Sequence, residues 1–514
     1  MTYAVGIDLG TTNSVVSIYR RGVVETLLID GRSTMPSVVS FRNDESVLVG
    51  QSAKARLQLD PENTVASTKR FMGDRSKSYC IGGKFLSPVN ISSLILKQLV
   101  EGASKALGET VRDVVIAIPA YFTEAQREDT KRAGEEAGLN ILRLIPEPTA
   151  AAIAYGLDKE KDQTLMVYDL GGGTFDVSIL AVKGNIFEVK AVGGDSCLGG
   201  DDFDQAIIVW ASKQFQAQTG IDLLSETSRV GMVARQRLKE AAETAKIELA
   251  QSNQAILAIP DCFGHPLELE LSLSEYNVLI APLLQRTVDC LKSVLRDANL
   301  EVEDIDRVIL VGGSTKNRAV KEMVSREIRD PYIAERVDEV VSHGSAIVAA
   351  NLYLPDAVNI EVTDVTAHSL GIAMLNAEEE LFFQPIIPRQ TTYPCRSGVL
   401  GYTNHPMQEE VNIRVFRGED TEPKRNTYLG ELLLPVSSPQ PEQIPIGAIF
   451  DLDADGIIHF TAVQLPVGLR SESIMQYGIE HDGALYLTVV DASIKSGEAK
   501  TKMVKIKSRD SSKK

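Results

Sequence analysis

The chain has 514 residues and a formal net charge of −17, and 44 % of its residues are hydrophobic while 24 % are charged. This length exceeds what one hydrophobic core supports, so two to four domains of ordinary globular composition are expected. The acidic balance argues against a nucleic-acid-binding protein, which needs a basic face, and no apolar run approaches the length of a membrane-spanning helix.

Five cysteines are scattered along the chain without a Cys-x-x-Cys motif: Cys80, Cys197, Cys262, Cys290 and Cys395. Neither a disulfide framework nor a zinc site is therefore indicated. The chain enters a predicted strand at once, without the basic segment and apolar core of a signal peptide. We therefore expect a protein of the reducing cytoplasm that does not act at a membrane.

The first predicted element is a hairpin with a polar tip. The apolar segment Tyr3–Ile7 is followed by the turn Asp8–Asn13 (DLGTTN) and by a second apolar segment, Ser14–Tyr19. Backbone N–H groups and hydroxyls in such a turn suit an anion, and an adjacent carboxylate can hold hydrated Mg²⁺ against phosphates. Taken alone, the pattern is more often an ordinary hairpin.

Further predicted elements lie between this hairpin and residue 151. A helix is expected over Gln51–Leu59, and a strand over Asp113–Ile118. The sequence Thr123–Gln126 (TEAQ) is a capping box that predicts a helix start. A strand over Ile141–Ile145 then leads to a helix that begins near Glu147.

A second copy of the polar turn lies 161 residues after the first. The segment Asp169–Asp176 (DLGGGTFD) is followed by Val177–Ile179 (VSI), and Val16–Ile18 (VSI) occupies the same place after the first turn. This repeat distance is too long for a solenoid unit. We therefore predict two related lobes, each with one acidic glycine bend, that hold a triphosphate from opposite sides.

Later segments are helical until a third glycine turn. Helices are expected over Val233–Leu249 and Ser274–Asn299. A continuously apolar strand, Val308–Val311, then enters the turn Gly312–Thr315 (GGST) and a helical stretch, Ala319–Arg329. Glycines here allow the backbone to pass close to a phosphate or a flat ring.

Five segments in order resemble the 70-kDa heat-shock protein family, the DnaK-type chaperones. They are Asp8–Asn13, Ile118–Phe122 (IPAYF), Glu147–Ala151 (EPTAA), Asp169–Asp176 and Gly312–Thr315. The resemblance runs from residue 3 to about residue 463, with weaker traces beyond. It implies an α/β fold of two duplicated actin/hexokinase-like (ribonuclease H-like) ATPase lobes, followed by an all-β sandwich that binds peptides.

The resemblance also implies a site for ATP or ADP with Mg²⁺. Lys69 would contact the γ-phosphate and orient the attacking water, and Asp8, Glu147 and Asp169 would hold Mg²⁺ mostly through water. The catalytic positions are Lys69, Glu147, Asp169, Thr174 and Asp176. The nucleotide-binding positions are Asp8, Gly10, Thr11, Thr12, Asn13, Gly171, Gly172, Gly173, Gly199, Gly200, Glu243, Lys246, Gly312, Gly313, Ser314, Lys316 and Asp338.

Several of these residues also have a plain structural interpretation. Lys69 has the alternative of a solvated surface lysine, the commoner fate of this residue type. Glu147 could serve only as a carboxylate that stabilises a helix N-terminus. Glu243 and Lys246, three positions apart, match an ordinary surface pair on a helix. Arg127 matches a family position for interdomain signalling or an exposed helix arginine.

Within residues 1–355 the chain departs from the family pattern at four points. The segment Asp74–Pro88 is shorter than usual, so one peripheral subdomain is expected to be trimmed. Pro146 replaces an asparagine, and Asp201 replaces a glutamate. Lys316 replaces an arginine that stacks on adenine, and lysine stacks less well than the planar guanidinium. We therefore expect somewhat weaker nucleotide binding than in the family.

The resemblance divides the chain into four parts: residues 1–355 as the nucleotide-binding domain, 356–365 as a linker, 366–499 as a β-sandwich substrate-binding domain and 500–514 as a basic tail. The linker sequence Ile360–Val365 (IEVTDV) keeps the family's Asp-Val pair but carries Glu361 and Thr363 where the family has leucines. Docking of this linker would bury less apolar surface, a loss of about 1–3 kcal/mol.

The segment from Thr366 onward alternates apolar and polar residues and contains turn sequences, which predicts an all-β domain. Four apolar positions match the family's peptide cleft, although a plain sandwich core would explain them equally well: Ile372, Leu375, Val411 and Ile413. No long amphipathic helical segment follows Val463, so we expect a short variant that lacks the helical lid.

These expectations describe an ATP-dependent molecular chaperone, an ATPase whose hydrolysis gates the binding of extended apolar peptides or unfolded client polypeptides. A J-domain co-chaperone and a nucleotide exchange factor are candidate partners, and no nucleic acid is expected. Two alternatives remain open at this stage. One is a small-molecule kinase of the same superfamily, which the β-rich C-terminal third disfavours. The other is a nucleotide-sensing filament protein, which the intact carboxylates disfavour.

Overall fold

The computed structural model describes residues 3–465, except for residues 82, 157–161, 227, 334–335, 354–357, 377–378, 438, 440 and 442, and then the strand segments 473–479, 485–491 and 500–505. The chain forms two compact units, Met1–Asp364 and Val365–Lys514. The expected division into four parts stays a prediction, since its boundary at residue 355 and part of its tail lie outside the described residues.

The first lobe of unit 1 is built on a sheet with the strand order β11-β10-β1-β2-β3. Strand β1 runs parallel to β10 and antiparallel to β2, and the short strand β4 also pairs with β2. The strands are β1 (Ala4–Asp8), β2 (Asn13–Arg20), β3 (Val23–Thr26), β4 (Met35–Pro36), β10 (Asp113–Ile118) and β11 (Asn140–Pro146).

The second lobe repeats this sheet strand for strand, in the order β18-β17-β12-β13-β14. The pairing register is repeated too, because Ile7 opposes Val16 in the first lobe and Tyr168 opposes Val177 in the second. The predicted duplication of lobes is therefore confirmed. The strands are β12 (Gln163–Leu170), β13 (Phe175–Lys183), β14 (Ile186–Asp195), β17 (Arg307–Val311) and β18 (Tyr332–Ile333).

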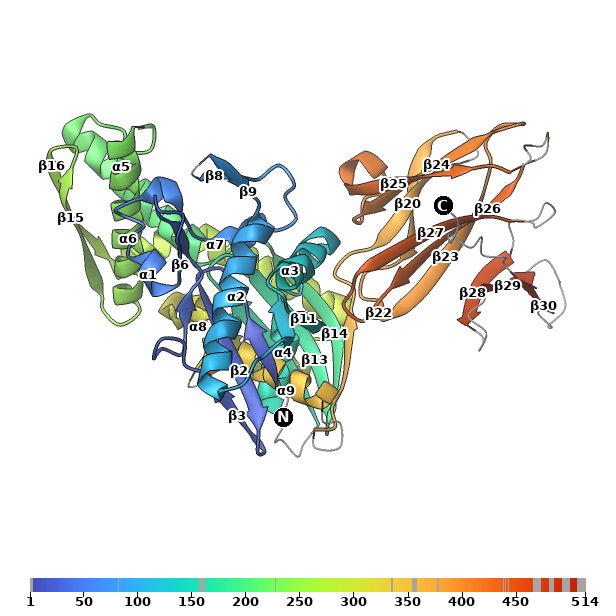
Figure 1. The fold of residues 1–514 in the computed structure, drawn as a ribbon, viewed down its shortest axis with the longest axis horizontal. Helices are drawn as coiled ribbons and strands as arrows, with labels where there is room; N and C mark the ends of the chain where they lie inside the picture. Colours follow the sequence, from blue (N-terminus) through green and yellow to red (C-terminus); the bar gives the residue numbers. More distant parts are fainter. Residues whose placement is uncertain are drawn as a thin grey trace. The chain divides into compact units, whose positions relative to one another are not determined.

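Helices cover the two sheets (Figure 1). The predicted capping box at Thr123 is present, since Gln126 N–H donates to Thr123 Oγ1 and Thr123 N–H donates to Gln126 Oε1. The helices of unit 1 are α1 (Gln51–Lys54), α2 (Pro88–Leu107), α3 (Glu124–Glu136), α4 (Glu147–Gly156), α5 (Gly200–Thr219), α6 (Arg229–Leu249), α7 (Leu273–Ala298), α8 (Arg318–Glu327) and α9 (Val340–Tyr353).

Our expected helix over Gln51–Leu59 is wrong in its length. Helix α1 ends at Lys54, because Arg56 and Leu57 donate to carbonyls three residues back, which winds the chain into turns. Other short elements of this unit are β5 (Val39–Phe41), β6 (Val47–Val49), β7 (Thr64–Val65), β8 (Tyr79–Ile81), β9 (Lys84–Leu86), η1 (Pro61–Asn63), η2 (Thr68–Phe71), η3 (Val302–Asp304) and η4 (Gly313–Lys316).

Helix α9 ties the two lobes together. It follows β18 of the second lobe but packs on β1 and β2 of the first lobe and against α4. A Cβ at Gly6 would collide with the Ala346 backbone, and one at Gly344 would collide with the Ala150 carbonyl. Small residues are thus required where this helix crosses its neighbours.

A separate helical part of the second lobe lies at one end of unit 1 in Figure 1, where α5 and α6 stand beside a two-stranded hairpin. The hairpin consists of β15 (Gln254–Cys262) and β16 (His265–Ser272). Alternate residues of β15, such as Ala255 and Leu257, are buried against the cluster that contains Leu238 and Phe215. Alternation along β15 therefore fixes which face of the hairpin packs on the helices.

Strand β19 (Glu361–Val365) lies at the end of unit 1 and reaches one residue beyond it. It runs parallel to β14, with Glu361 opposite Ile186 and Thr363 opposite Glu188. The linker-like sequence of this segment therefore adds a strand to the edge of the second lobe's sheet. Its Asp364 is buried and its carboxylate Oδ1 accepts a 2.8 Å hydrogen bond from Thr149 Oγ1 of α4.

Unit 2 is an all-β sandwich, as predicted. Ile372 and Ile413 from one sheet and Ala448 and Phe450 from the other share its buried core. One sheet has the order β21-β20-β24-β25 and the other the order β23-β26-β27. The strands are β20 (Leu370–Leu375), β21 (Leu381–Ile387), β22 (Thr392–Tyr393), β23 (Cys395–Tyr402), β24 (Glu410–Arg417), β25 (Thr427–Pro435), β26 (Pro445–Leu452) and β27 (Ile458–Gln464), with η5 (Pro423–Arg425).

Three further strands form an antiparallel sheet of their own in unit 2: β28 (Ser473–Ile479), β29 (Leu485–Asp491) and β30 (Lys500–Lys505). The beginning of the expected basic tail is thus the last strand of this sheet, while residues 506–514 lie outside the described part of the chain.

Candidate functional site

The first polar bend joins β1 to β2, and Ser37 supports it with two hydrogen bonds. Ser37 Oγ donates to the Gly10 carbonyl at 2.7 Å, and Ser37 N–H donates to the Thr12 carbonyl at 2.8 Å. A Cβ at Gly10 would collide with the Asn13 carbonyl, so glycine is needed for the turn to close. Ser37 was missed by sequence analysis because it lies outside the motif that it supports.

The second bend joins β12 to β13 and is closed by Gly171 N–H, which donates to the Thr174 carbonyl at 3.0 Å. The first turn of α5 rests on this bend, because Gly200 N–H donates to Gly171 O at 2.9 Å and Asp201 N–H donates to Gly172 O at 2.7 Å. Backbone contacts thus fix the position of α5 relative to the bend.

The two bends face each other directly. A Cβ at Gly172 would collide with the Thr12 hydroxyl, and a Cβ at Gly173 would approach Thr11 Oγ1 at 2.9 Å. The glycines of the second lobe therefore let its backbone contact the threonines of the first. The expectation that two bends meet from opposite lobes agrees with this geometry.

A buried ion pair lies beside the bends. Lys69 Nζ is 2.5 Å from Glu147 Oε1, and the two side chains are only 6 % and 9 % exposed. Burial favours a lower pKa of Lys69, but the carboxylates of Glu147 and Asp8 outweigh it and hold this pKa above its usual value. Lys69 is consequently charged and is not the solvated surface lysine of the alternative interpretation.

Carboxylates concentrate around Lys69. Burial, together with the charge of Glu147, raises the pKa of Asp8 to about 7 and that of Asp176 to about 7. Burial and the neighbouring charges of Glu147 and Asp176 also raise the pKa of Asp169. So many buried acidic groups around one lysine form a strongly electronegative site that a cation would stabilise.

The donor set fits Mg²⁺ held through water rather than by direct ligation. Among the described residues, no group of three or more acidic, histidine or cysteine side chains converges closely enough to hold a metal ion by itself. Mg²⁺ prefers to keep several waters and to bind one or two carboxylates with substrate phosphates. Asp8, Glu147 and Asp169 lie on the wall of the same cavity and would serve as such outer partners.

The opposite end of the site is formed by the third glycine turn and by α6. Gly312 has φ +82, and a Cβ there would collide with the Leu170 carbonyl, so only glycine fits. Lys316 Nζ pairs with Asp338 Oδ2 at 2.5 Å. Lys246 Nζ contacts Asp204 Oδ1 at 2.8 Å and donates to Gly200 O at 3.1 Å.

Glu243 on α6 lies 3.8 Å from Lys54 Nζ of α1, so this pair bridges the second lobe to the first. Asp204, which was not predicted as a site residue, is buried beneath Lys246, and burial raises its pKa to about 6. No sequence signal singles out Asp204, since it is the last carboxylate of the run Asp201–Asp204.

One cavity of about 560 Å³ collects most of the predicted site residues. Of the predicted positions, it is lined by Asp8, Gly10, Thr11, Thr12, Asn13, Lys69, Glu147, Asp169, Gly171, Gly172, Thr174, Gly200, Glu243, Lys246, Gly312, Gly313, Ser314, Lys316 and Asp338. It is also lined by residues that sequence analysis did not select, among them Ser67, Asp201, Asp204 and Lys239.

Three predicted positions lie behind the cavity wall. Asp176 Oδ1 accepts a 2.9 Å hydrogen bond from Tyr121 N–H, and the cavity lining does not include it. Gly173 and Gly199 are likewise outside the lining. Because neither has a side chain, the second bend can pack closely against Arg70 and the start of α5. Direct nucleotide contact by these three residues stays a prediction.

The four predicted peptide-binding residues of unit 2 differ in how far their side chains are exposed to solvent. Ile372 and Ile413 are buried in the sandwich core, and Val411 packs against that core. Leu375 is 38 % exposed at the end of β20. Core packing accounts for the first three, so only Leu375 is presented to solvent as a peptide contact would be.

The duplicated sheets, the facing glycine bends and the shared cavity define an ATPase of the actin/hexokinase-like class. The family model described as "Hsp70 protein" matches residues 4–81 and 74–483. The chain therefore belongs to the Hsp70 family, and it is an ATP-dependent molecular chaperone that hydrolyses ATP. The match extends beyond residue 463, where sequence analysis expected the resemblance to fade.

Relatives support the assignment across most of the chain. It is 41 % identical over 510 residues to "Chaperone protein DnaK" of Thermus thermophilus, and the alignment covers 93 % of this chain and 81 % of the relative. It is 42 % identical over 490 residues to "Chaperone protein DnaK" of Thermotoga neapolitana, with 92 % and 80 % covered.

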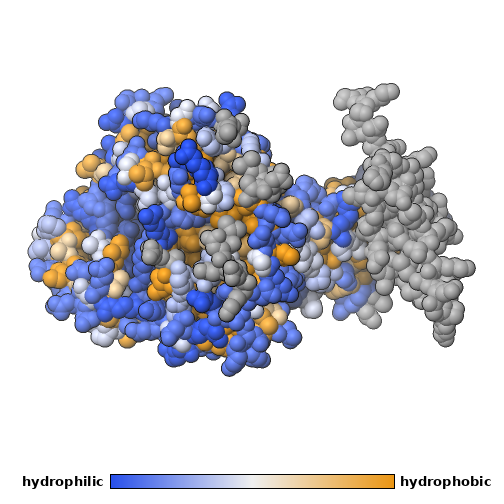
Figure 2. Space-filling model, turned by 90° about the horizontal axis from the view of Figure 1, so that it is seen from below, coloured by the Kyte–Doolittle hydropathy of each residue, from blue (hydrophilic) through white to orange (hydrophobic). Residues whose placement is uncertain are grey.

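The polarity of the surface agrees with the ordinary globular composition of the chain. The face shown in Figure 2 is mainly hydrophilic, with hydrophobic residues in small groups. In the described part of the chain, no helix combines the length and the apolar character that crossing a membrane requires.

Proposed function

We propose that the cavity between the lobes binds ATP with its phosphates between the two glycine bends and its base near the third glycine turn. The observation that supports this proposal is the contact of Gly172 with Thr12 beside the buried pair of Lys69 and Glu147. Thr11, Thr12, Asn13, Gly171, Gly172 and Thr174 would cradle the phosphates with backbone and hydroxyl donors.

Hydrolysis in this site would depend on positioning and charge neutralisation. Bound Mg²⁺ would supply positive charge to the phosphate oxygens, and Asp8, Glu147 and Asp169 would hold its waters. Lys69, kept cationic by Glu147, would place its ammonium against the transferred phosphoryl group. Asp176, whose carboxylate accepts a hydrogen bond from Tyr121 N–H, would act from behind the cavity wall. It would orient the attacking water or balance the positive charge of Lys69 and Mg²⁺.

Glu243, Lys246, Gly312, Gly313, Ser314, Lys316 and Asp338 would enclose the ribose and adenine. Ser314 Oγ donates to Gly171 O at 2.8 Å, so the third turn is joined to the second phosphate bend. This link supports a single nucleotide that spans both regions.

We further propose that hydrolysis gates the binding of extended client polypeptides by the sandwich of unit 2. Extended peptides are recognised by main-chain hydrogen bonds and pockets for alternate side chains. Leu375 is the exposed candidate contact, while Ile372, Val411 and Ile413 would form its support. A J-domain co-chaperone and a nucleotide exchange factor are proposed partners, and the cytoplasm is the proposed location.

A peptide-stimulation assay tests this function. Steady-state ATP hydrolysis by the full chain should rise severalfold when an extended apolar peptide is added, and should not respond to a matched peptide of charged residues. Equal rates with both peptides would contradict gating. The same assay separates the alternatives, since a sugar kinase would phosphorylate a small molecule and a filament protein would pellet with nucleotide.

A further inference from the structure

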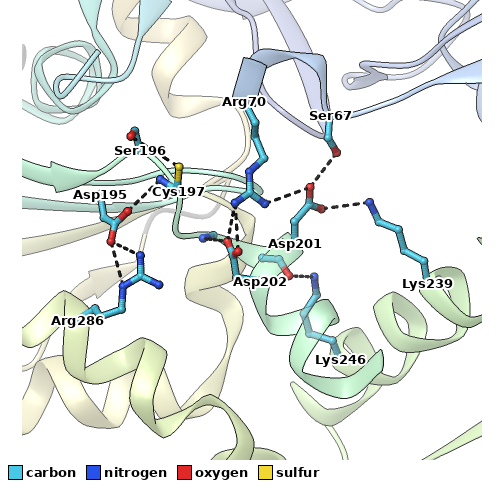
Figure 3. Close-up of polar contacts among 12 residues, drawn as sticks. Ser67, Arg70, Asp195, Ser196, Cys197, Asp201, Asp202, Lys239, Lys246 and Arg286 are labelled. Carbon is cyan, nitrogen blue, oxygen red and sulfur yellow. Dashed lines mark hydrogen bonds and ion pairs between the residues drawn. The ribbon is translucent and has the colours of Figure 1, made fainter. Parts of the chain in front are cut away.

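The turn that carries Lys69 belongs to the first lobe but is held by side chains of the second. Ser67 precedes η2 and Arg70 lies within it, so the two residues flank Lys69. Ser67 Oγ donates to Asp201 Oδ2 at 2.8 Å, and Arg70 Nη2 donates to Asp202 Oδ1 at 3.1 Å (Figure 3). Arg70 Nη1 also lies 3.9 Å from Asp201 Oδ2.

The backbone conformation of Ser67 is one that needs support from its surroundings. Ser67 has φ 54 and ψ 30, the left-handed region that a residue with a Cβ seldom adopts. Such backbone strain persists only where the surroundings determine it. The hydrogen bond to Asp201 is the described side-chain contact that holds Ser67 in this conformation.

Asp201 also contacts the second phosphate bend, through its backbone. Its N–H donates to Gly172 O at 2.7 Å, and the neighbouring Gly200 N–H donates to Gly171 O at 2.9 Å. One residue therefore connects the Lys69 turn of the first lobe, by its carboxylate, to the glycine bend of the second, by its amide.

The charges around Asp201 favour this connection. Arg70 approaches from η2, and Lys239 Nζ of α6 lies 3.8 Å from Asp201 Oδ1 (Figure 3). The side chain of Asp201 is 15 % exposed and that of Arg70 is 21 % exposed, so solvent screens these pairs less than fully exposed ones.

We propose that Asp201 is a positioning residue for ATP hydrolysis, which sets Lys69 against the second phosphate bend. The proposal rests on the proposed role of Lys69. Asp201 lines the cavity, and in this proposal it acts through Lys69 and Gly172 rather than on the reacting atoms. The contacts with Ser67 and Arg70 should therefore affect the hydrolysis step more than nucleotide affinity.

Single-turnover ATP hydrolysis by the full chain tests this inference with Ser67→Ala, Asp201→Ala and the double variant. Each single variant should slow hydrolysis about 3- to 10-fold, and the double variant should be no slower than the slower single one, because contacting residues are coupled. Asp201→Asn keeps an acceptor for Ser67 and should recover part of the rate. ATP affinity should change less than 2-fold.

Glu327→Gln is the matched control, since Glu327 pairs with Arg326 in α8 and should leave the rate unchanged. Additive effects in the double variant, or wild-type rates in Ser67→Ala, would overturn the inference. Ser67→Ala decides the question even where Asp201→Ala does not fold. Lys69→Ala separates the two proposals. A fully active Lys69→Ala variant would contradict the proposed role of Lys69. An inactive Lys69→Ala variant, together with Ser67 and Asp201 variants that hydrolyse ATP at the wild-type rate, would contradict only the positioning role of Asp201.

Discussion

Lys69 Nζ lies 2.5 Å from Glu147 Oε1, although the lysine comes from η2 and the glutamate opens α4. A buried charge is tolerated when it is paired, and removal of one partner leaves the other uncompensated at a cost of about 3–5 kcal/mol. The pair therefore fixes the lysine ammonium on the cavity wall. Because Lys69 and Glu147 line the same cavity as the two glycine bends, this pair is the buried charged contact beside them.

Replacement of Lys69 should separate binding from chemistry. We expect Lys69→Ala to lower single-turnover ATP hydrolysis at least 100-fold, because the cation beside the phosphates is lost, while ATP still binds through the bends. Rapid-quench hydrolysis and fluorescent-nucleotide titration measure the two effects. Lys84→Ala is the control, since this exposed lysine pairs with Glu45. Retained single-turnover hydrolysis in Lys69→Ala would refute the assignment.

The buried carboxylates predict an unusual pH dependence of stability. In the protein free of metal and nucleotide, burial raises the pKa of Asp8 and of Asp176 from 3.8 to about 7. Between these values the folded state binds protons that the unfolded state has lost, so the free energy of unfolding falls as pH rises through this window. From pH 6 to pH 8, one group with a pKa near 7 accounts for about 1.4 kcal/mol.

Denaturant unfolding in the presence of a chelator checks this prediction at pH 6 and pH 8. Unit 1 should be less stable at pH 8, and Asp8→Asn should reduce the difference by about 1 kcal/mol. Mg²⁺ with ADP should also reduce it, because a cation favours the ionised carboxylates. Glu45→Gln, at an exposed position, is the control. A wild-type protein that is equally stable or more stable at pH 8 would argue against the prediction.

Lys316 should limit nucleotide affinity. Its ammonium pairs with Asp338 Oδ2 at 2.5 Å on the cavity wall. An arginine could keep this pair and also stack its planar group on adenine. We expect Lys316→Arg to tighten ADP binding about 3- to 10-fold in isothermal titration. Lys321→Arg, on the exposed face of α8, should have no effect. Unchanged affinity in Lys316→Arg would contradict stacking at this position.

The hydrogen bond between Thr149 and Asp364 should stabilise β19 on the edge of β14. Burial raises the pKa of Asp364, whereas the Thr149 hydroxyl favours its ionised form. Thr149→Val should weaken the docked strand by about 1–2 kcal/mol, because a buried acceptor loses its donor. Hydrogen exchange of the Glu361–Asp364 amides should then speed up roughly 5- to 30-fold.

Thr244→Val provides the comparison for this measurement. The Thr244 hydroxyl donates to the Glu240 carbonyl within α6, so its loss should leave β19 exchange unaltered. Asp364→Asn should protect β19 at least as well as wild type, because the amide is cheaper to bury and still accepts from Thr149. Unaltered exchange in Thr149→Val would show that the bond does not hold the strand.

Local sequence patterns predicted the strands and the polar bends that short runs of residues determine by themselves. The bends Asp8–Asn13 and Asp169–Asp176 are readable because glycine and hydroxyl residues follow apolar strands, and the repeat predicted two lobes. The length of the helix after Gln51 was wrong, because the backbone after Lys54 turns through hydrogen bonds to carbonyls three residues back, which residue propensity did not reveal.

Contacts between distant segments could not be predicted from one sequence. Ser67 and Asp201 are 134 residues apart, and neither belongs to a recognisable motif with the other. Asp204, beneath Lys246, could not be distinguished from the neighbouring carboxylates of its run. Alternating strands also do not reveal whether Ile372 faces a cleft or a core; its side chain is buried in the sandwich core, and its role as a peptide contact stays a prediction.

The pairing of β19 with β14 has a consequence for competition by other chains. An open strand edge accepts any extended backbone that offers matching donors and acceptors, which is the route to both peptide recognition and misassembly. Here the covering strand is tethered to the same molecule, so its local concentration is on the order of millimolar. A foreign peptide would have to exceed that concentration to displace β19, so the tethered strand protects β14 from adventitious partners.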